Sequence, residues 1–240
     1  MLGSRTPVVL VALCLLCCAM GAAFAADIVT LPTANQLKAG EVDLATYYIA
    51  VDNGGLIVPL RSLGIDSIRV QTIYAGLTDK IELDIHRYDV DLPAGLNGVT
   101  TIFNASYLVV TEDAKKPNVV LGGRDLTSEL GHASWYAAAA KTLNPPVGGP
   151  PTGPIYRVHL GLGTEDSTLF GEPRHDGLFG GLQVCVVPTY PMVGAIALYD
   201  GQDIITGLTY TYKPTWPTIK AGTFGGHSWV GLNYTFNCKQ

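Results

Sequence analysis

Charged side chains are scarce in this sequence. Only 15% of its 240 residues are Asp, Glu, Lys or Arg, and their balance leaves a formal net charge of −5 at pH 7. An acidic chain of this kind is a poor partner for nucleic acid, so we expect no nucleic-acid ligand. Cysteine is also scarce, and three of the five cysteines lie within the first 18 residues. We expect the other two, Cys185 and Cys238, to be inert thiols, with a disulfide between them as the alternative.

Long apolar runs are confined to the N-terminus. Arg5 is followed by the apolar run 8–20 and then by the small-x-small sequence Ala23-Phe24-Ala25. This pattern predicts a cleaved signal peptide at residues 1–25, and an uncleaved anchor is the alternative. The rest of the chain has no second apolar stretch near 20 residues, so a helical membrane span is excluded there. If the chain lies in a membrane, it crosses as strands.

Alternation of apolar and polar side chains is the main pattern of the remaining sequence. Residues 80–88 are the clearest case, with Ile81, Leu83 and Ile85 alternating with Glu82, Asp84 and His86. A period of two is typical of a β-strand with one apolar and one polar face, and no helical period fits it. Tight connections such as Gly225-Gly226 suit hairpins.

Twelve such runs are predicted, near residues 40–51, 67–76, 79–90, 100–110, 117–123, 133–142, 154–163, 177–188, 192–199, 203–213, 218–224 and 227–236. Because most neighbours in sequence become neighbours in space, the fold class is all-β. We expect an up-and-down antiparallel transmembrane β-barrel of about 12 strands, with ten as the alternative. The domains are then the signal peptide 1–25, an N-terminal opening segment 26–39, one barrel domain 40–236 and a C-terminal tail 237–240.

The connections between these runs differ in length. If both termini are periplasmic, the long or polar connections 52–66, 91–99, 124–132 and 164–176 all lie on the outer side. The stretch from Asn144 to Pro154, rich in Pro and Gly, is the exception, because it falls on the side where turns are short. It indicates either a miscounted strand or an insertion.

Two sets of residues carry the functional hypotheses. The first is a polar cluster predicted to face the lumen, where charges set ion selectivity, bind a polar solute or form a salt-bridge network that fills the interior: Arg69, Gln71, Glu82, Asp84, His86, Arg157 and His159. The second is an aromatic girdle at the level of the lipid headgroups: Trp135, Tyr136, Trp229, Tyr210, Tyr212, Tyr234 and Phe236.

The C-terminal half carries a resemblance. The segments 177–183, 197–201, 207–210 and 230–236, with the opening Leu31-Pro32-Thr33-Ala34, resemble bacterial outer-membrane barrels associated with exopolysaccharide secretion. The resemblance implies an outer-membrane location. Outer-membrane lipid, the barrel assembly machinery and polysaccharide-export components are the partners it implies. One departure is that Phe236 is followed by four further residues, where such chains usually end on an aromatic residue.

Motifs for chemistry are missing. Gly226-His227-Ser228-Trp229-Val230 resembles a nucleophile elbow but has valine in place of the second glycine. No phosphate loop or metal motif is found, so we expect no metal site and no cofactor. The sequence therefore favours a non-enzymatic outer-membrane barrel, a narrow pore or an envelope or exopolysaccharide-export component. The alternatives are a soluble, secreted lipocalin-like binder of a small hydrophobic ligand and an outer-membrane hydrolase.

Overall fold

The computed structural model describes residues 27–28, 31–50, 67–91, 97–145, 151, 153–164 and 175–238. The predicted signal peptide 1–25 lies outside the described residues, whereas the opening segment and the C-terminal tail are described in part. Every regular element in the described residues is a strand. Within the same residues, no helix is long and apolar enough to cross a membrane.

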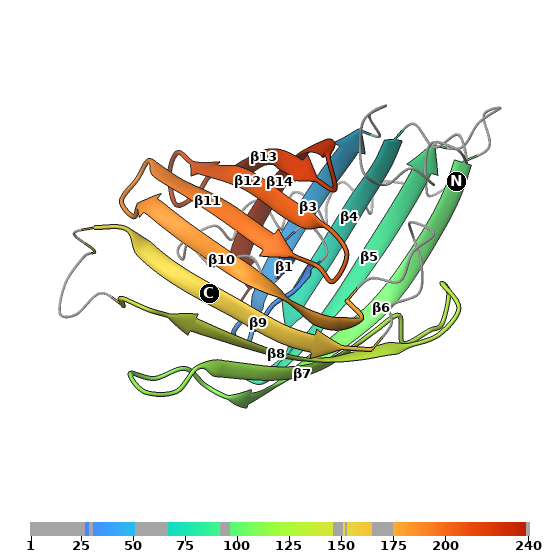
Figure 1. Cartoon of the computed structure of the whole chain (residues 1–240), viewed down its shortest axis with the longest axis horizontal. Coiled ribbons are helices and arrows are strands. Elements are labelled where there is room, and N and C mark those ends of the chain that lie inside the picture. The colour runs from blue at the N-terminus through green and yellow to red at the C-terminus, as the bar shows by residue number, and fades with distance from the viewer. Residues whose placement is uncertain are drawn as a thin grey trace, which may run out of the picture.

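Fourteen strands are formed by the described residues. They are β1 Asp27–Ile28, β2 Leu31–Pro32, β3 Glu41–Ala50, β4 Ser67–Gly76, β5 Ile81–Asp91, β6 Asn97–Val110, β7 Asn118–Arg124, β8 Ser134–Thr142, β9 Ile155–Gly163, β10 Gly177–Val187, β11 Met192–Tyr199, β12 Ile204–Thr211, β13 Thr218–Phe224 and β14 His227–Asn237. β1 and β2 pair with each other, and β3 to β14 form one closed barrel. Figure 1 shows these strands wrapping around a single interior.

The barrel is an antiparallel meander. Each strand from β3 to β14 pairs with the next in sequence, and β14 closes the ring by pairing with β3 from Ser228↔Ala50 to Asn237↔Glu41. The predicted all-β, up-and-down barrel of about 12 strands is therefore confirmed, and each predicted run coincides with one barrel strand. Closure leaves no exposed strand edge, so the backbone groups of every strand can be satisfied within the sheet.

The two ends of the barrel differ. We call the end where β3 begins and β14 finishes the terminal end, and the opposite one the loop end. At the loop end β13 and β14 are joined by Gly225 and Gly226, whose φ angles of 55° and 86° are the left-handed values that a two-residue hairpin requires. β8 ends and β9 begins at the terminal end. The strand count agrees with the prediction and so does not support a miscounted strand between them, while residues 146–150 and 152 of the Pro- and Gly-rich stretch lie outside the described residues.

The interior is packed by aromatic rings that lie over glycines of other strands. Three of these glycines are on the adjacent strand, and one, Gly207 of β12 against Trp229 of β14, is two strands away. A Cβ atom added to the glycine would approach within 2.6 Å of the ring in four pairs: Gly231 with Tyr47, Gly122 with Tyr136, Gly161 with Phe179 and Gly207 with Trp229. Tyr47 and Trp229 also contact each other edge to face, with ring centroids 6.1 Å apart. The missing side chains of these glycines thus provide the space that the inward-pointing rings fill.

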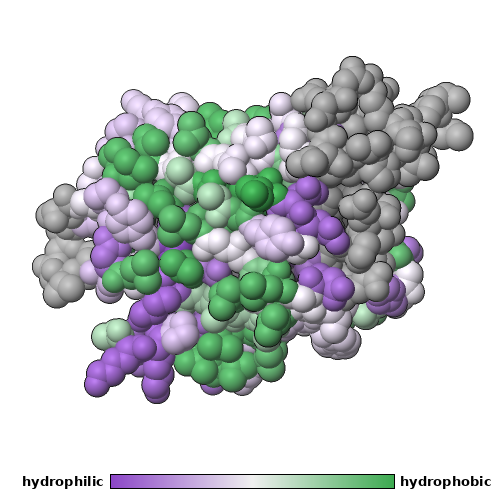
Figure 2. All heavy atoms as spheres, in the orientation of Figure 1, coloured by the Kyte–Doolittle hydropathy of each residue, from purple (hydrophilic) through white to green (hydrophobic). Residues whose placement is uncertain are grey.

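The outer face of the barrel is largely apolar. Figure 2 shows hydrophobic side chains gathered over the middle of the visible face, with hydrophilic ones concentrated toward its ends. At mid-height of adjacent strands, Ile73, Ile85 and Phe103 lie side by side and are 48%, 36% and 45% exposed. A continuous exposed apolar surface is unusual for a protein surrounded by water.

Candidate functional site

The polar groups of β5 line the interior of the barrel. Glu82, Asp84 and His86 are 5%, 7% and 0% exposed, while the intervening Leu83 and Ile85 are on the outer face. The strand has two faces because successive side chains point to opposite sides of a sheet. β5 therefore places two carboxyl groups and an imidazole in one row on the inner wall.

Asp84 and His86 form the centre of a network of polar contacts. Asp84 Oδ1 lies 2.8 Å from His86 Nε2, and His86 Nδ1 lies 3.2 Å from the hydroxyl of Tyr88. Asn104 on β6 donates from its amide nitrogen to Asp84 and accepts the backbone N–H of Asp125 at 2.9 Å. The network connects the inner wall to the β7–β8 connection, because the Asp125 carboxylate accepts the backbone N–H of residues 129 and 130.

A second cluster surrounds Arg157 on β9. Its Nη1 donates to Glu112 Oε2 at 2.6 Å and to Thr142 Oγ1 at 2.8 Å, and its Nε donates to Asn35 Oδ1 at 2.6 Å. Arg157 is 6% exposed. A buried guanidinium requires such partners, since an unpaired charge away from water is costly. The cluster joins β8, β9, the β6–β7 connection and the opening segment.

Glu112 follows β6 and lies outside the strands. Burial disfavours its charged form and by itself raises its pKa, but the hydrogen bonds from Arg157 and Thr142 and the positive charge of Arg157 outweigh burial. The net result is a Glu112 pKa below the ordinary value. The ionised carboxylate is thus the form that the Arg157 cluster favours.

Two further polar groups occupy other parts of the wall. His159 Nε2 lies 2.7 Å from Gln183 Oε1, which joins β9 to β10. Asn233 on β14 donates from its amide to both oxygens of Asp43, at 3.3 and 3.2 Å, and Lys220 Nζ lies 3.5 Å from the hydroxyl of Tyr47. The wall is therefore polar on several sides.

Five of the seven predicted lumen residues lie in the interior, and two do not. Glu82, Asp84, His86, Arg157 and His159 are all less than 9% exposed. The structure corrects the other two positions: Arg69 and Gln71 are exposed on the outer face, and Arg69 pairs with Asp89 at 3.7 Å. The physical reason is that β4 begins at the loop end, where its inward side chains, Ile68 and Val70, are apolar and fully buried, so the alternate residues Arg69 and Gln71 face outward.

The residues of the predicted girdle divide between the two faces of the barrel. Trp135, Tyr210 and Tyr212 are 59%, 40% and 44% exposed. Tyr136 cannot share a face with its neighbour Trp135 in a strand, and it points inward over Gly122. Trp229 is 3% exposed and packs in the interior, where its Nε1 donates to the backbone oxygen of residue 206 at 3.2 Å. Placing Tyr136 and Trp229 in the girdle was therefore wrong.

Tyr234 and Phe236 share one face of β14. Their rings stack at a centroid distance of 6.0 Å with an interplanar angle of 26°. Tyr234 is half-buried, whereas Phe236 is 7% exposed. Phe236 therefore presents little aromatic surface to its surroundings, in contrast to Tyr210 and Tyr212.

Further exposed aromatic side chains lie at the terminal end, as Tyr210 and Tyr212 do. They are 38% to 54% exposed and comprise Tyr107, Tyr156, Tyr190 and Trp216. Tyr212 and Trp216 contact each other edge to face at 5.2 Å. Only strand direction and register reveal that these rings, which are far apart in sequence, lie at the same end.

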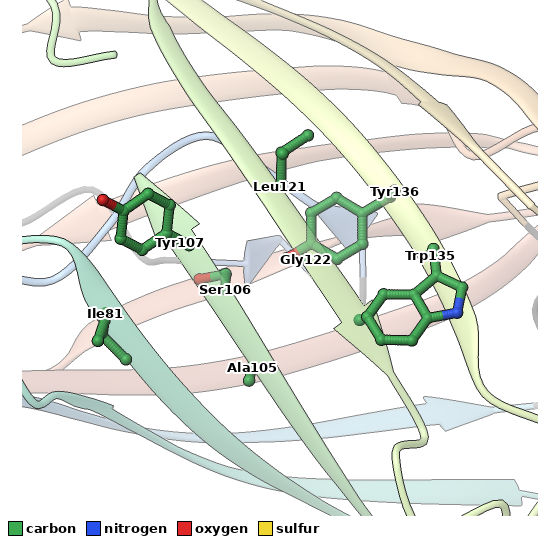
Figure 3. A pocket seen from close by; sticks show the side chains of 9 residues that line it. Ile81, Ala105, Ser106, Tyr107, Leu121, Gly122, Trp135 and Tyr136 are labelled. Atoms are coloured by element: carbon green, nitrogen blue, oxygen red, sulfur yellow. The ribbon is translucent and has the colours of Figure 1, made fainter. Parts of the chain in front are cut away.

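An apolar groove indents the outer face between β5 and β8 (Figure 3). Tyr107 and Trp135 stand on opposite sides of it, with Leu121 and Gly122 of β7 between them. Gly123 forms part of its floor. On the outer face of β7, Gly123 brings no side chain into the groove, whereas Gly122 faces the interior against Tyr136.

The described residues offer little for catalysis or metal binding. They contain no group of three or more His, Cys, Asp and Glu side chains that could hold a metal ion. Ser228 is exposed on the outer face, whereas His227 and Trp229 are buried, so the elbow-like sequence is a strand with alternating faces. No disulfide joins Cys185 and Cys238.

Several interior residues were missed in the sequence. Lys220 is the lone charge of the predicted strand 218–224, which is a signal that could have identified it, whereas Asp43 shares its predicted strand with Glu41. Asn104 and Asn233 carry no such signal, because amide side chains are common on either face. The burial of the opening segment was missed as well.

No protein-family model matches the chain, and no curated protein matches it.

Proposed function

We propose that the protein is a non-enzymatic β-barrel of the bacterial outer membrane whose interior forms a narrow pathway for small polar solutes. The observation that carries the proposal is the polarity of the barrel wall. In β5 the inward side chains are Glu82, Asp84 and His86, and the outward ones include Leu83 and Ile85. A barrel in hydrocarbon requires this arrangement, because lipid surrounds the outer face and water or polar groups occupy the inner one.

The outer surface supports the same proposal. Its exposed apolar side chains are continuous across adjacent strands, and aromatic side chains are exposed at the terminal end. Amphipathic rings are favoured at the boundary between hydrocarbon and headgroups. The groove between Tyr107 and Trp135 is lined almost entirely by apolar atoms, which suits contact with acyl chains. Outer-membrane lipid is therefore the first proposed partner.

The lipocalin-like alternative has less support. A soluble barrel that binds a hydrophobic ligand needs an apolar interior and a polar exterior, and β5 has the opposite arrangement. An outer-membrane hydrolase needs a nucleophile beside a base, and the elbow-like Ser228 faces away from His227.

A role in exopolysaccharide export, with its export partners and the barrel assembly machinery, rests on the sequence resemblance alone.

The first experiment is gel mobility of the protein from outer-membrane fractions in mild detergent, with and without boiling. We expect faster migration of the unboiled sample and retention in the membrane after a carbonate wash, because a closed barrel in lipid resists both treatments. Recovery as a soluble periplasmic protein, with one mobility before and after boiling, contradicts the proposal.

A further inference from the structure

Residues 31–37 of the opening segment lie inside the barrel. Leu31, Ala34 and Leu37 are 0%, 0% and 1% exposed, and Leu31 and Ala34 belong to the same apolar cluster as the interior rings of Tyr47 and Tyr88. Lys38 is exposed and Ala39 is half-buried, and these two residues lead to Gly40. We call residues 31–39 the plug, and its first seven residues occupy part of the interior.

Three walls of the barrel hold the plug through polar contacts. From β5, Glu82 Oε2 accepts the backbone N–H of Leu37 at 2.8 Å. From β9, Arg157 Nε donates to Asn35 Oδ1 at 2.6 Å, and from β7, Asn118 Nδ2 donates to the backbone oxygen of residue 34 at 3.2 Å. Two of these contacts involve an ionisable side chain that faces the interior. The polar wall residues thus have a specific partner within the chain.

The plug is not a strand of the barrel. In the described residues β2 pairs with β1 and with no strand of the closed sheet. At its C-terminal end the plug joins β3 through Gly40, whose φ of 86° is a conformation that favours glycine. Gly40 is tied to the terminal end by its N–H to the oxygen of Gly76 and by its oxygen to the N–H of Cys238, at 2.8 and 2.7 Å. A segment held by separate contacts and joined at a fixed pivot can leave without disturbing the barrel ladder.

We propose that residues 31–39 are a releasable plug that gates the barrel interior, with Glu82 and Arg157 as its anchors and Gly40 as its pivot. The inference rests on the proposed function and adds a regulatory element to the same pathway. With the plug in place, the space along β5, β7 and β9 is filled by the chain itself. Its departure exposes Glu82, Asn118 and Arg157 to a polar solute.

The test weakens the plug and leaves the barrel wall intact. The double variant Asn35→Ala/Leu37→Ala removes the Asn35 oxygen that accepts from Arg157 Nε, and it removes the buried side chain of Leu37. Lys38→Ala is the matched control, because the Lys38 side chain belongs to the same segment but is exposed. The full mature protein and each variant are reconstituted in planar lipid bilayers, and single-channel currents of KCl are recorded.

A second readout follows the plug itself. Thr33 is 4% exposed, so a Thr33→Cys substitution, made with Cys185→Ser and Cys238→Ser, places one thiol in the buried segment. The rate of its reaction with a membrane-impermeant maleimide measures how often the plug leaves the interior. Gel mobility with and without boiling confirms that each variant is a closed barrel.

We expect the double variant to raise the open probability and the labelling rate together, by roughly tenfold or more, since a charge-assisted hydrogen bond and a buried leucyl side chain are lost. Lys38→Ala should behave as the wild type. The gate proposal is contradicted if the double variant forms a closed barrel but changes neither quantity, or raises labelling without raising conductance. Either result leaves the proposed membrane barrel unaffected. Absence of the wild type and all variants from the membrane fraction overturns both proposals.

Discussion

At the scale of single residues, the interior is organised by glycines that accommodate rings. Tyr47 lies over Gly231 and touches Trp229, which in turn lies over Gly207. Each ring fills the space left by a glycine, on the neighbouring strand for Tyr47 and two strands away for Trp229, so the packing is complementary in shape and not only apolar. A small residue is therefore required at these positions, although the sequence alone suggests only a strand glycine that a larger residue could replace.

We predict that Gly231→Ala destabilises the barrel by about 1–3 kcal/mol, the usual cost of overpacking. The new Cβ would lie 2.3 Å from Cδ1 of Tyr47 and would displace that ring from Trp229. The measurement is urea-induced unfolding in detergent followed by tryptophan fluorescence. Gly153→Ala is the control, because a Cβ there meets nothing within 4 Å. Equal stability of the two variants would show that the Tyr47 ring moves freely.

At the scale of elements, each strand divides its side chains between two environments, and the division changes along its length. In the middle of β4 and β5 the outward side chains are apolar, as Ile73 and Ile85 show. Toward the loop end the outward side chains become polar, with Arg69 paired to Asp89 and with Gln71 exposed. If the apolar part marks the hydrocarbon, these strands extend beyond it at the loop end.

We predict that Ile85→Arg lowers the free energy of unfolding in lipid vesicles by about 2–4 kcal/mol, because the arginine would face hydrocarbon near mid-height. At a water-exposed position the same change would usually stay within about 0.5 kcal/mol. Gln71→Arg is the control, since Gln71 is already a polar residue of the outer face. Indistinguishable unfolding curves for the two variants would contradict a lipid-facing position for Ile85.

At the scale of the whole molecule, closure of the sheet and burial of the plug depend on contacts between distant parts of the chain. The barrel is completed by β14 and β3, which lie at opposite ends of the barrel domain. Arg157 bonds both Asn35 and Glu112, so one side chain connects the plug, β9 and the β6–β7 connection. Loss of this junction should weaken the folded state as a unit.

We predict a dependence of stability on pH through Glu112. Because its hydrogen bonds with Arg157 and Thr142 and the charge of Arg157 outweigh burial and hold its pKa below the unfolded value of about 4.5, its contribution is fully present above that pH. It is lost as the pH falls through the lower pKa of the folded state. Chemical unfolding at about pH 6 and about pH 3 should therefore show a smaller loss in Glu112→Gln than in the wild type.

The control for this prediction is Glu129→Gln, a change in the β7–β8 connection, where the side chain is exposed. It should keep the pH dependence of the wild type. Identical pH dependence in Glu112→Gln and the wild type would mean that the Arg157 cluster does not depend on the charge of Glu112.

The strands and their order could be predicted from the sequence because both are local. Alternation such as that of residues 80–88 reports which strand face is polar, and short Gly-rich turns allow only neighbouring strands to pair. Glu82, Asp84 and His86 were placed in the interior on this basis. The same rule misplaced Arg69 and Gln71, since it assumes that polar side chains point inward along the whole strand.

The sequence by itself therefore determined the strand pattern, the closed meander and the polar row of β5. Only the tertiary structure decided the burial of residues 31–37, the inward direction of Tyr136 and Trp229, and the meeting of Asn35, Glu112 and Arg157. The physical reason is that periodicity in the sequence shows only which side chains share a face of one strand. Which residues meet across the interior depends on closure and register, and these arise only when all twelve strands of the barrel pair.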